Sequence, residues 1–529
     1  MLTLFPTETA LSAAAVSLAK AGDGFAAANP DLVRLLSAIQ RGGDPLGDAF
    51  TALRSSAERR KEGAVYTPPA IVQSMLAWAV DQGTPERVVD PGAGSGRFLI
   101  AAGHAFPDAR LVGVELDPLA ARMLRANLAV NGMTDRAVVL EADYRSARLP
   151  AIRGRTLFIG NPPYVRHHGI DASWKTWYRL TAAKFGIKAS GLAGLHAHFF
   201  LRTLQLARSG DFGAFITAAE WLDVNYGAAV RRMLTERLGC VGLHVLEPSV
   251  LPFAGSVTTG AITCFRVGLK PATMRIRSVN SADALNRLAE GDDVALSRAA
   301  ITPRWSVFMR AAEPSARADF VPLGELVRVS RGQVTGCNEV WIAGAAARRL
   351  PSQVLAPTVT KARELIAAGD ELGPEAALRC VVNLPVDLDE IEKCFRAAVD
   401  RFLAWAARQG ADTGYVATHR RAWWSVQLYE PAPMLCTYMA RRPPAFVRNL
   451  RDAHHLNIAH GLYPREKLTD LQMRQLLAFL RSRVTVADGR TYAGGLTKFE
   501  PRELERIQVP RLDALDAIAA DMDRVANPA

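Results

Sequence analysis

The stretch VVDPGAGSGRF (Val88–Phe98) decides the fold class of this chain. An apolar run ends in Asp90, glycines follow at Gly92, Gly94 and Gly96, and an apolar, helix-like segment comes next. Glycine has no side chain, so such a turn can adopt unusual backbone conformations and let a ligand touch the backbone. A buried strand, this turn and a helix, in that order, predict an α/β domain with a ligand at the turn.

Apolar runs alternate with amphipathic stretches from Arg87 to Arg266. After the glycine-rich turn the order continues through ARLVGVELDPLAARMLRANLAVNG (109–132), AVVLEAD (137–143), TLFIGNPPY (156–164), GDFGAFITAAEWL (210–222), VGLHVLE (241–247) and GAITCFRV (260–267). This alternation predicts a mainly parallel, Rossmann-like sheet with helices on both faces. Ligands of such sheets bind beyond the carboxyl ends of the strands.

The chain has 529 residues, which is long for one hydrophobic core, so we expect more than one domain. Residues 1–60 predict a helical segment and residues 61–275 the α/β domain. The alternation is lost over 276–320, which predicts a crossover. Residues 321–529 predict an α+β domain with short strands in ELVRVSRGQVTG, EVWIA and RCVVNLP, and with a helix over Leu468–Arg483.

The bulk composition narrows the class of protein. The formal charge is +12 and the pI is near 9.6, which favours a polyanionic partner such as nucleic acid. The six cysteines are scattered without metal-ligand spacing, so we expect reduced thiols and no metal. No apolar run is long enough for a membrane span, and no positively charged segment precedes the first apolar stretch, so we expect a cytoplasmic protein.

The glycine-rich turn departs from two common nucleotide fingerprints. Arg97 stands where the dinucleotide pattern G-x-G-x-x-G has its third glycine, and no G-K-S/T follows to form a P-loop. Neither NAD nor ATP is therefore favoured.

Acidic residues end the first three predicted strands. Asp90 ends the first, Glu115 ends the second, where a carboxylate can accept a ribose diol, and Asp143 ends the third, where it can accept an adenine amino proton. Tyr144, beside Asp143, can pack on the adenine ring. Three carboxylates would repel a pyrophosphate but suit a cationic adenosyl ligand, so we predict S-adenosylmethionine. Any one of these acids could instead cap a helix.

Seven stretches then follow one another in a family-specific order: GAVYTPPAIVQSML (63–76), DPGAGSGRF (90–98), VELD (114–117), EADY (141–144), GNPPYVR (160–166), GDFGAFITAAEWL (210–222) and PFAGSVTTGAITCF (252–265). In this order the chain resembles the amino-group DNA methyltransferases, in particular the gamma-ordered adenine-N6 enzymes of the TaqI-like and Eco57I-like group. The resemblance covers nearly the whole chain from residue 61. It implies a class I S-adenosylmethionine-dependent methyltransferase domain followed by a DNA target-recognition domain.

The N-P-P-Y stretch suits methyl transfer to an amino group. An amino nitrogen conjugated to a base is a poor nucleophile, and two oxygen acceptors for its N–H groups help it become tetrahedral. Asn161 can offer its side-chain carbonyl and Pro162 its backbone carbonyl, while Pro162 and Pro163 fix the turn. Tyr164 can stack on a base swung out of the duplex. The alternative is an ordinary turn at the end of a strand.

The resemblance adds two residues and a reaction. Phe253 matches the second aromatic wall around the target base, and Thr67 matches the residue that helps to hold the methionine part of the cofactor. The implied reaction is one in-line displacement that releases S-adenosylhomocysteine, with no metal and no covalent intermediate. Cytosine-C5 transfer needs an attacking thiolate, usually from a Pro-Cys pair, and no cysteine here follows a proline.

The C-terminal half interleaves arginines with aromatic residues, which suits phosphates, guanine and unstacked base steps. The candidate DNA contacts are Arg166, His167, Arg420, Arg421, Arg441 and Arg442. Alternatively, Trp423, Trp424 and Tyr429 belong to a core and the arginines to a solvated face.

The predicted partner is double-stranded DNA. Cytosine-N4 transfer would use the same corner, an RNA or glutamine methyltransferase also carries N-P-P-Y, and a noncatalytic specificity subunit is a further alternative. Residues 1–60 are too few for a nuclease domain, so we expect modification without cleavage. Whether the chain has a cognate restriction endonuclease as a separate partner stays open. The choice between a monomer and a homodimer stays open.

Overall fold

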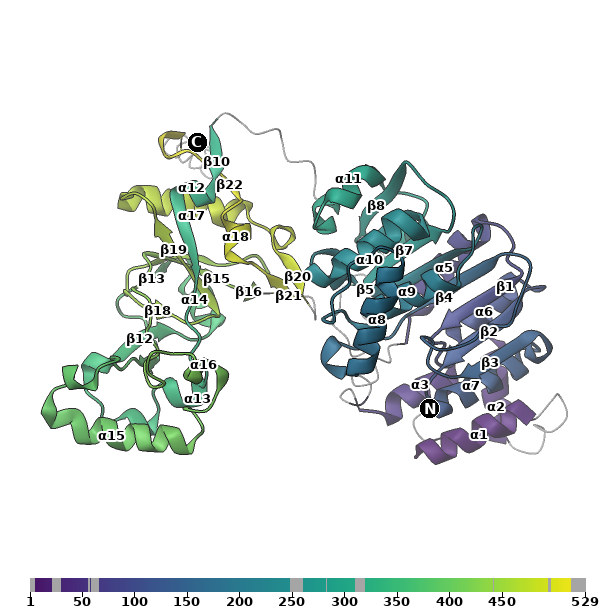
Figure 1. Ribbon diagram of the computed structural model, residues 1–529, viewed down its shortest axis with the longest axis horizontal. Helices are drawn as coiled ribbons and strands as arrows, with labels where there is room; N and C mark the ends of the chain where they lie inside the picture. The colour runs from purple at the N-terminus through teal and green to yellow at the C-terminus, as the bar shows by residue number, and fades with distance from the viewer. Residues whose placement is uncertain are drawn as a thin grey trace. The chain divides into compact units, whose positions relative to one another are not determined.

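The computed structural model describes residues 5–20, 30–55, 58, 66–247, 260–281, 283–309, 319–440, 442–492 and 496–514. The chain divides into two compact units, one up to residue 311 and one from residue 312 onward. Figure 1 labels many of the elements of both units.

The first unit is built on a nine-stranded sheet with the order β3-β2-β1-β4-β5-β7-β6-β8-β9. Strands β1 to β5 run parallel, and β7 is antiparallel to both of its neighbours. The strands are β1 (Arg87–Pro91), β2 (Arg110–Glu115), β3 (Ala137–Glu141), β4 (Thr156–Gly160), β5 (Phe212–Ala218), β6 (Cys240–Leu246), β7 (Gly260–Arg266), β8 (Thr273–Val279) and β9 (Asp292–Ala295). The predicted α/β, Rossmann-like fold is confirmed.

Helices cover both faces of this sheet (Figure 1). Neighbouring strand residues point to opposite faces, and accordingly Val88 belongs to the core on one side while Val89 belongs to the core on the other. The helices are α1 (Glu8–Lys20), α2 (Pro30–Gln40), α3 (Pro45–Leu53), α5 (Pro69–Asp81), α6 (Arg97–Ala105), α7 (Pro118–Val130), α8 (Ala172–Lys184), α9 (Leu195–Leu206), α10 (Ala228–Met233) and α11 (Leu296–Ile301).

The N-terminal helices pack on α7 through a core of their own (Figure 1). Buried residues of α1, α2 and α3, among them Leu11, Ile39 and Phe50, meet Leu119 and Met123 of α7. These helices are therefore part of the first unit.

Strands β8 and β9 extend the sheet into the stretch where the sequence predicts a crossover. Met274, Ile276 and Val279 of β8 are buried, whereas Thr273, Arg275 and Ser278 are exposed. Such a partly polar strand is a weak signal in a sequence, because a polar loop has a similar composition.

The second unit contains a five-stranded sheet with the order β11-β19-β15-β17-β13 and three smaller sheets. Its strands are β10 (Phe320–Pro322), β11 (Val327–Arg331), β12 (Leu355–Val359), β13 (Glu371–Leu372), β14 (Cys380–Val382), β15 (Met434–Thr437), β16 (Met439–Ala440), β17 (Phe446–Asn449), β18 (His454–His455), β19 (Ala459–Pro464), β20 (Arg490–Tyr492), β21 (Leu496–Lys498) and β22 (Gln508–Pro510).

The helices of this unit are α12 (Leu323–Leu326), α13 (Asn338–Trp341), α14 (Ala362–Ala368), α15 (Lys393–Arg408), α16 (Tyr415–Thr418), α17 (Asp470–Arg483) and α18 (Pro501–Leu504). The predicted α+β class is confirmed, and α17 matches the predicted helix closely. The strand expected in EVWIA is wrong, because this stretch forms the helical turn α13. A short apolar run has no period that separates a strand from a buried helical turn.

Across the described ranges, no helix has the length and apolar character needed to cross a membrane. In the same part of the chain, no group of three or more histidine, cysteine or acidic side chains is placed to hold a metal ion.

Candidate active site

A cavity of about 590 Å³ lies at the carboxyl ends of β1, β2 and β4, where the fold class predicts a ligand. Of the predicted site residues, eight line it: Thr67, Gly92, Gly94, Glu115, Asp143, Tyr144, Asn161 and Pro163. Residues at the ends of four strands, β1, β2, β3 and β4, and Thr67 from the segment before α5 thus converge on one space.

The glycine-rich turn forms one wall of the cavity. Gly92, Gly94 and Gly96 all have positive φ angles, of 82°, 57° and 100°. A Cβ on Gly92 would lie 3.5 Å from Pro163 Cδ, and one on Gly94 would lie 3.6 Å from the Tyr66 ring. Positive φ is easily adopted only by glycine, which accounts for the spacing of the three glycines.

Gly96 has a structural part in this turn. It precedes α6 and packs against α7, where an added Cβ would come within 2.5 Å of Leu124 Cδ1. It does not line the cavity.

Asp90 lies behind the cavity wall, beside the backbone of Gly160. Its side chain is 1% exposed, and neither carboxylate oxygen has a hydrogen-bond partner in the part of the chain that the structure describes. Burial, and then the charge of Glu115, raise the pKa of Asp90 well above its usual value. A cation nearby would stabilise this carboxylate.

Glu115 holds the glycine-rich turn to the end of β2. Its Oε2 accepts a hydrogen bond from Gly94 N at 2.8 Å, and its Oε1 accepts one from Asp117 N at 2.8 Å. Burial raises the pKa of Glu115, while these backbone donors oppose that shift. Each carboxylate oxygen has more than one lone pair, so Glu115 can still accept from a ligand.

Asp143 and Tyr144 already have partners at the end of β3. Arg145 forms a bidentate ion pair with Asp143, with Nη2 2.6 Å from Oδ2 and Nε 2.9 Å from Oδ1. The Tyr144 ring is buried, and its hydroxyl lies 3.0 Å from Thr203 Oγ1. Both residues line the cavity from fixed positions.

The N-P-P-Y stretch follows β4 at the edge of the cavity. The amide of Asn161 donates from Nδ2 to Thr67 Oγ1 at 3.1 Å, which orients the carbonyl oxygen of the amide away from Thr67. Asn161 and Pro163 line the cavity, whereas Pro162 and Tyr164 do not. The Tyr164 hydroxyl is buried without a hydrogen-bond partner among the described residues, and burial raises its pKa. Phe253 lies outside the described residues.

Several lining residues carry no sequence signal that identifies them. Phe50 comes from α3, Trp174 from α8 and Phe199 from α9, and each looks like an ordinary apolar residue of its own helix. Trp174 stacks under the Arg145 guanidinium at 4.0 Å. Other lining residues lie within the quoted motifs, among them Tyr66 beside Thr67 in YTPP and Ser95 in the glycine-rich turn.

The candidate DNA contacts are dispersed. Arg166 is exposed beside the N-P-P-Y stretch, and the His167 ring lies 3.7 Å from the His168 ring at an angle of 41°. Arg421 and Arg442 are exposed in the second unit. Arg441 lies outside the described residues.

The residues around Arg420 agree in part with the alternative interpretation, in which the aromatic side chains of this stretch belong to a core. Arg420 donates to the Val334 carbonyl at 2.6 Å. Trp423 and Trp424 are half-buried against a core of the second unit, and Trp424 Nε1 donates to Pro385 O at 3.1 Å. Tyr429 is 49% exposed.

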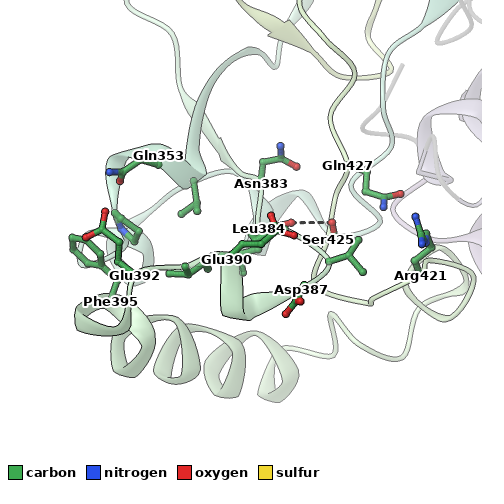
Figure 2. A pocket seen from close by; sticks show the side chains of 15 residues that line it. Gln353, Asn383, Leu384, Asp387, Glu390, Glu392, Phe395, Arg421, Ser425 and Gln427 are labelled. Atoms are coloured by element: carbon green, nitrogen blue, oxygen red, sulfur yellow. Dashed lines mark hydrogen bonds between the residues drawn. The ribbon is translucent and has the colours of Figure 1, made fainter.

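A cavity of about 750 Å³ lies in the second unit (Figure 2). Arg421 lines it, together with the carboxylates of Asp387, Glu390 and Glu392. Because the acidic side chains outnumber the arginine there, this cavity does not suit a phosphate backbone.

Comparison with known proteins matches both halves of the chain. Residues 154–240 match the family described as Eco57I restriction-modification methylase, and residues 299–527 match the C-terminal domain of Type II methyltransferase M.Eco57I. The chain is 56% identical, over 86% of both sequences, to Type II methyltransferase M.XamI of Xanthomonas campestris pv. amaranthicola. It is 20% identical, over 88% of both, to Type II methyltransferase M.AccI of Acinetobacter calcoaceticus.

Among solved structures, the type IIG restriction endonuclease BpuSI aligns with 95% of this chain and 65% of its own length. The TM-score is 0.47 and the identity 16%, which is too distant to bear on function.

Proposed function

The chain belongs to the Eco57I-type restriction-modification methylases, Type II DNA methyltransferases that use S-adenosylmethionine, and from this premise we propose that it methylates N6 of a flipped-out adenine. The site that holds the target amino group would be formed by Asn161, Pro162, Pro163 and Tyr164. The observation that carries the proposal is the hydrogen bond between Asn161 Nδ2 and Thr67 Oγ1, because it holds the acceptor amide at the edge of the cavity.

The cavity fits S-adenosylmethionine in shape and charge. Gly92 and Gly94 leave room for close approach to the backbone, and the carboxylate of Asp90 is buried without a compensating partner in the described ranges. An unpaired buried charge is costly, and a cationic ligand would offset that cost. Glu115 would accept the ribose hydroxyls, and Asp143 would face the adenine amino group.

When bound, S-adenosylmethionine supplies an electrophilic methyl group on sulfur. Asn161 and Pro162 would accept hydrogen bonds from the two N–H bonds of the target amino group, which directs the nitrogen lone pair towards the cavity. Tyr164 would stack on the base and Phe253 would close its other face. No side chain needs to form a bond to the base.

The target base is the part of the proposal that the family does not decide. Labelled methyl transfer to unmethylated duplex DNA, followed by mass spectrometry of the nucleosides, tests it. N6-methyladenine supports the proposal. N4-methylcytosine would leave the proposed role of the N-P-P-Y residues unchanged and would make cytosine the target base. Label in RNA or protein alone would refute DNA as the substrate.

We expect Asn161→Ala to abolish methyl transfer while S-adenosylmethionine still binds, because the variant removes an acceptor for the target nitrogen and keeps the glycine-rich turn. Isothermal titration calorimetry and the labelled transfer assay measure the two effects separately. Asn131→Ala is the matched control, since Asn131 caps the end of α7 and does not line the cavity. Transfer at the normal rate by Asn161→Ala would contradict the proposed acceptor.

In the cell, we propose that the enzyme acts on double-stranded DNA in the bacterial cytoplasm and protects sites that a cognate restriction endonuclease cuts. The exposed arginines Arg166 and Arg442 are the proposed DNA contacts among the described residues, whereas Arg421 lines the acidic cavity of the second unit. Genome-wide mapping of modified bases in a methylation-free host that expresses the chain would give the recognition sequence.

A further inference from the structure

Asp44 connects the N-terminal helices to the glycine-rich turn. As the N-cap of α3 it accepts a hydrogen bond from Gly47 N at 2.9 Å through Oδ1. Its other oxygen, Oδ2, accepts from Ser95 Oγ at 2.5 Å and from Arg97 Nε at 2.7 Å. One carboxylate therefore both caps a helix and holds two side chains of the turn.

Arg97 is the centre of this network. Besides its bond to Asp44, its Nη2 lies 2.7 Å from Asp48 Oδ1, and its Nη1 donates to the Thr67 carbonyl at 3.2 Å. The guanidinium also lies over the Tyr66 ring, 4.9 Å from its centroid. Burial would lower the pKa of Arg97, but the neighbouring carboxylates, Asp44 first, raise it.

The same chain of contacts reaches the methyl-transfer corner. Arg97 holds the backbone of Thr67, and the Thr67 hydroxyl accepts the hydrogen bond from Asn161 Nδ2. Thr67 is 3% exposed, so its contacts are shielded from water. A displacement of Arg97 would therefore change the position of the Asn161 amide.

The backbone of the turn is held from a second side. Asn127 of α7 donates from Nδ2 to the Ser95 carbonyl at 2.8 Å and lies 3.4 Å from Asp44 Oδ1. The packing leaves no spare room, because a Cβ on Gly47 would lie 2.1 Å from Asp44 Oδ2 and 2.7 Å from Ser95 Oγ.

We propose that Asp44 is a positioning residue for methyl transfer: it fixes Ser95 and Arg97, and through them the cofactor-binding turn and, by way of Thr67, the amide of Asn161. This inference rests on the proposed location of the cofactor in the first cavity. The N-terminal helices would then help to position the residues of the cofactor site. A turn that is ordered before the ligand arrives binds more tightly, because its ordering entropy is not lost on binding.

Two substitutions separate this role from helix capping. Asn and Ser are as good as Asp at an N-cap, so Asp44→Asn and Asp44→Ser keep the cap of α3. Asn puts an NH₂ group where Arg97 and Ser95 need an acceptor, and Ser is too short to reach them. We expect both variants to unfold near the wild-type temperature and to bind S-adenosylmethionine about tenfold more weakly, on the order of one charged hydrogen bond.

Kinetics provide a second measurement. KM for S-adenosylmethionine should rise and kcat should fall in the Asp44 variants, because both the turn and Asn161 lose their support, while KM for DNA stays the same. Asp48→Asn is the matched control. Asp48 contacts Arg97 from a side chain that is 63% exposed, so its loss should change both constants far less.

Binding measured by calorimetry without DNA distinguishes this inference from the proposed function. Weaker binding in the two Asp44 variants but not in Asp48→Asn supports the positioning role, whichever base is methylated. Wild-type affinity in both Asp44 variants, or a loss of affinity only in step with a loss of thermal stability, overturns it. If Asp90→Asn also binds like the wild type, the cofactor lies elsewhere and the proposed site itself fails.

Discussion

At the scale of single residues, Asp90 and Asn161 lie at the ends of neighbouring strands and differ in charge. Asp90 is a buried carboxylate that needs a positive charge, whereas Asn161 is a neutral amide whose orientation is set by Thr67. Because β1 and β4 are adjacent in the sheet, the Asp90 carboxyl lies against Gly160, next to Asn161. One edge of the sheet can thus attract a cationic donor and orient an acceptor.

The raised pKa of Asp90 predicts a pH dependence of cofactor binding. The free enzyme holds a proton on Asp90 below this pKa, and a cationic ligand favours the ionised form, so binding releases the proton. Affinity for S-adenosylmethionine should therefore increase as the pH rises towards the pKa of Asp90 and level off above it. Calorimetry in buffers of different ionisation enthalpy measures the released proton. A flat profile with no proton release would contradict an ion pair with Asp90.

The side chain of Tyr164 predicts a contrast between two variants. Its hydroxyl is buried and, among the described residues, has no hydrogen-bond partner, so Tyr164→Phe should keep the wild-type kcat/KM. Tyr164→Ala should cost about 1–3 kcal/mol of transition-state stabilisation through lost stacking on the base. Equal losses in the two variants would assign the role to the hydroxyl instead of the ring.

At the scale of elements, the turn between β1 and α6 joins the proposed cofactor site to α7. Gly96 has a φ of 100° and nearly touches Leu124 of α7. The glycines that line the cavity and the glycine that packs on α7 therefore belong to the same short turn.

Gly96→Ala should lower the free energy of unfolding by more than the cost of positive φ alone, about 2–4 kcal/mol in total. Gly132→Ala is the matched control, because Gly132 also has a positive φ of 65° but has open space where the Cβ would go. Its cost should be about 1–2 kcal/mol. Urea denaturation of both variants measures the difference, and equal destabilisation would rule out the clash with Leu124.

At the scale of the whole molecule, the net charge of +12 belongs to a protein whose family acts on DNA. Phosphate contacts release counterions, so affinity for DNA decreases as salt concentration rises. Affinity for S-adenosylmethionine should depend on salt much less, because the Asp90 carboxyl beside its proposed site is only 1% exposed and is screened little by salt.

Arg442→Ala should weaken DNA binding and reduce the slope of log K against log salt by about one unit, as expected for one phosphate contact. Arg34→Ala is the control, since Arg34 is exposed on α2 and pairs with Asp31. Fluorescence anisotropy across a salt series measures both slopes. The same slope for wild type and Arg442→Ala would exclude Arg442 as a phosphate contact.

The sequence by itself determined the features that are written in short, consecutive patterns. Strand, glycine-rich turn and helix follow from local periodicity, and the order of motifs predicted the α/β fold with a second α+β domain. Eight predicted site residues, including Thr67, Glu115 and Asn161, meet around one cavity because strand ends of a parallel sheet share an edge. Strands β8 and β9, at one end of the sheet, and the helical turn α13 were missed, since their local patterns are ambiguous.

Only the tertiary structure decided which distant residues support that site. No residue near Asp44 in the chain predicts a contact with Arg97. In the sequence, Arg97 is notable only because it stands where the G-x-G-x-x-G pattern has its third glycine. Likewise, Asp143 is already paired with Arg145, and Phe50 and Trp174 reach the cavity from separate helices. The physical reason is that strand and helix periods depend on neighbours in the chain, whereas hydrogen bonds between elements depend on how those elements pack.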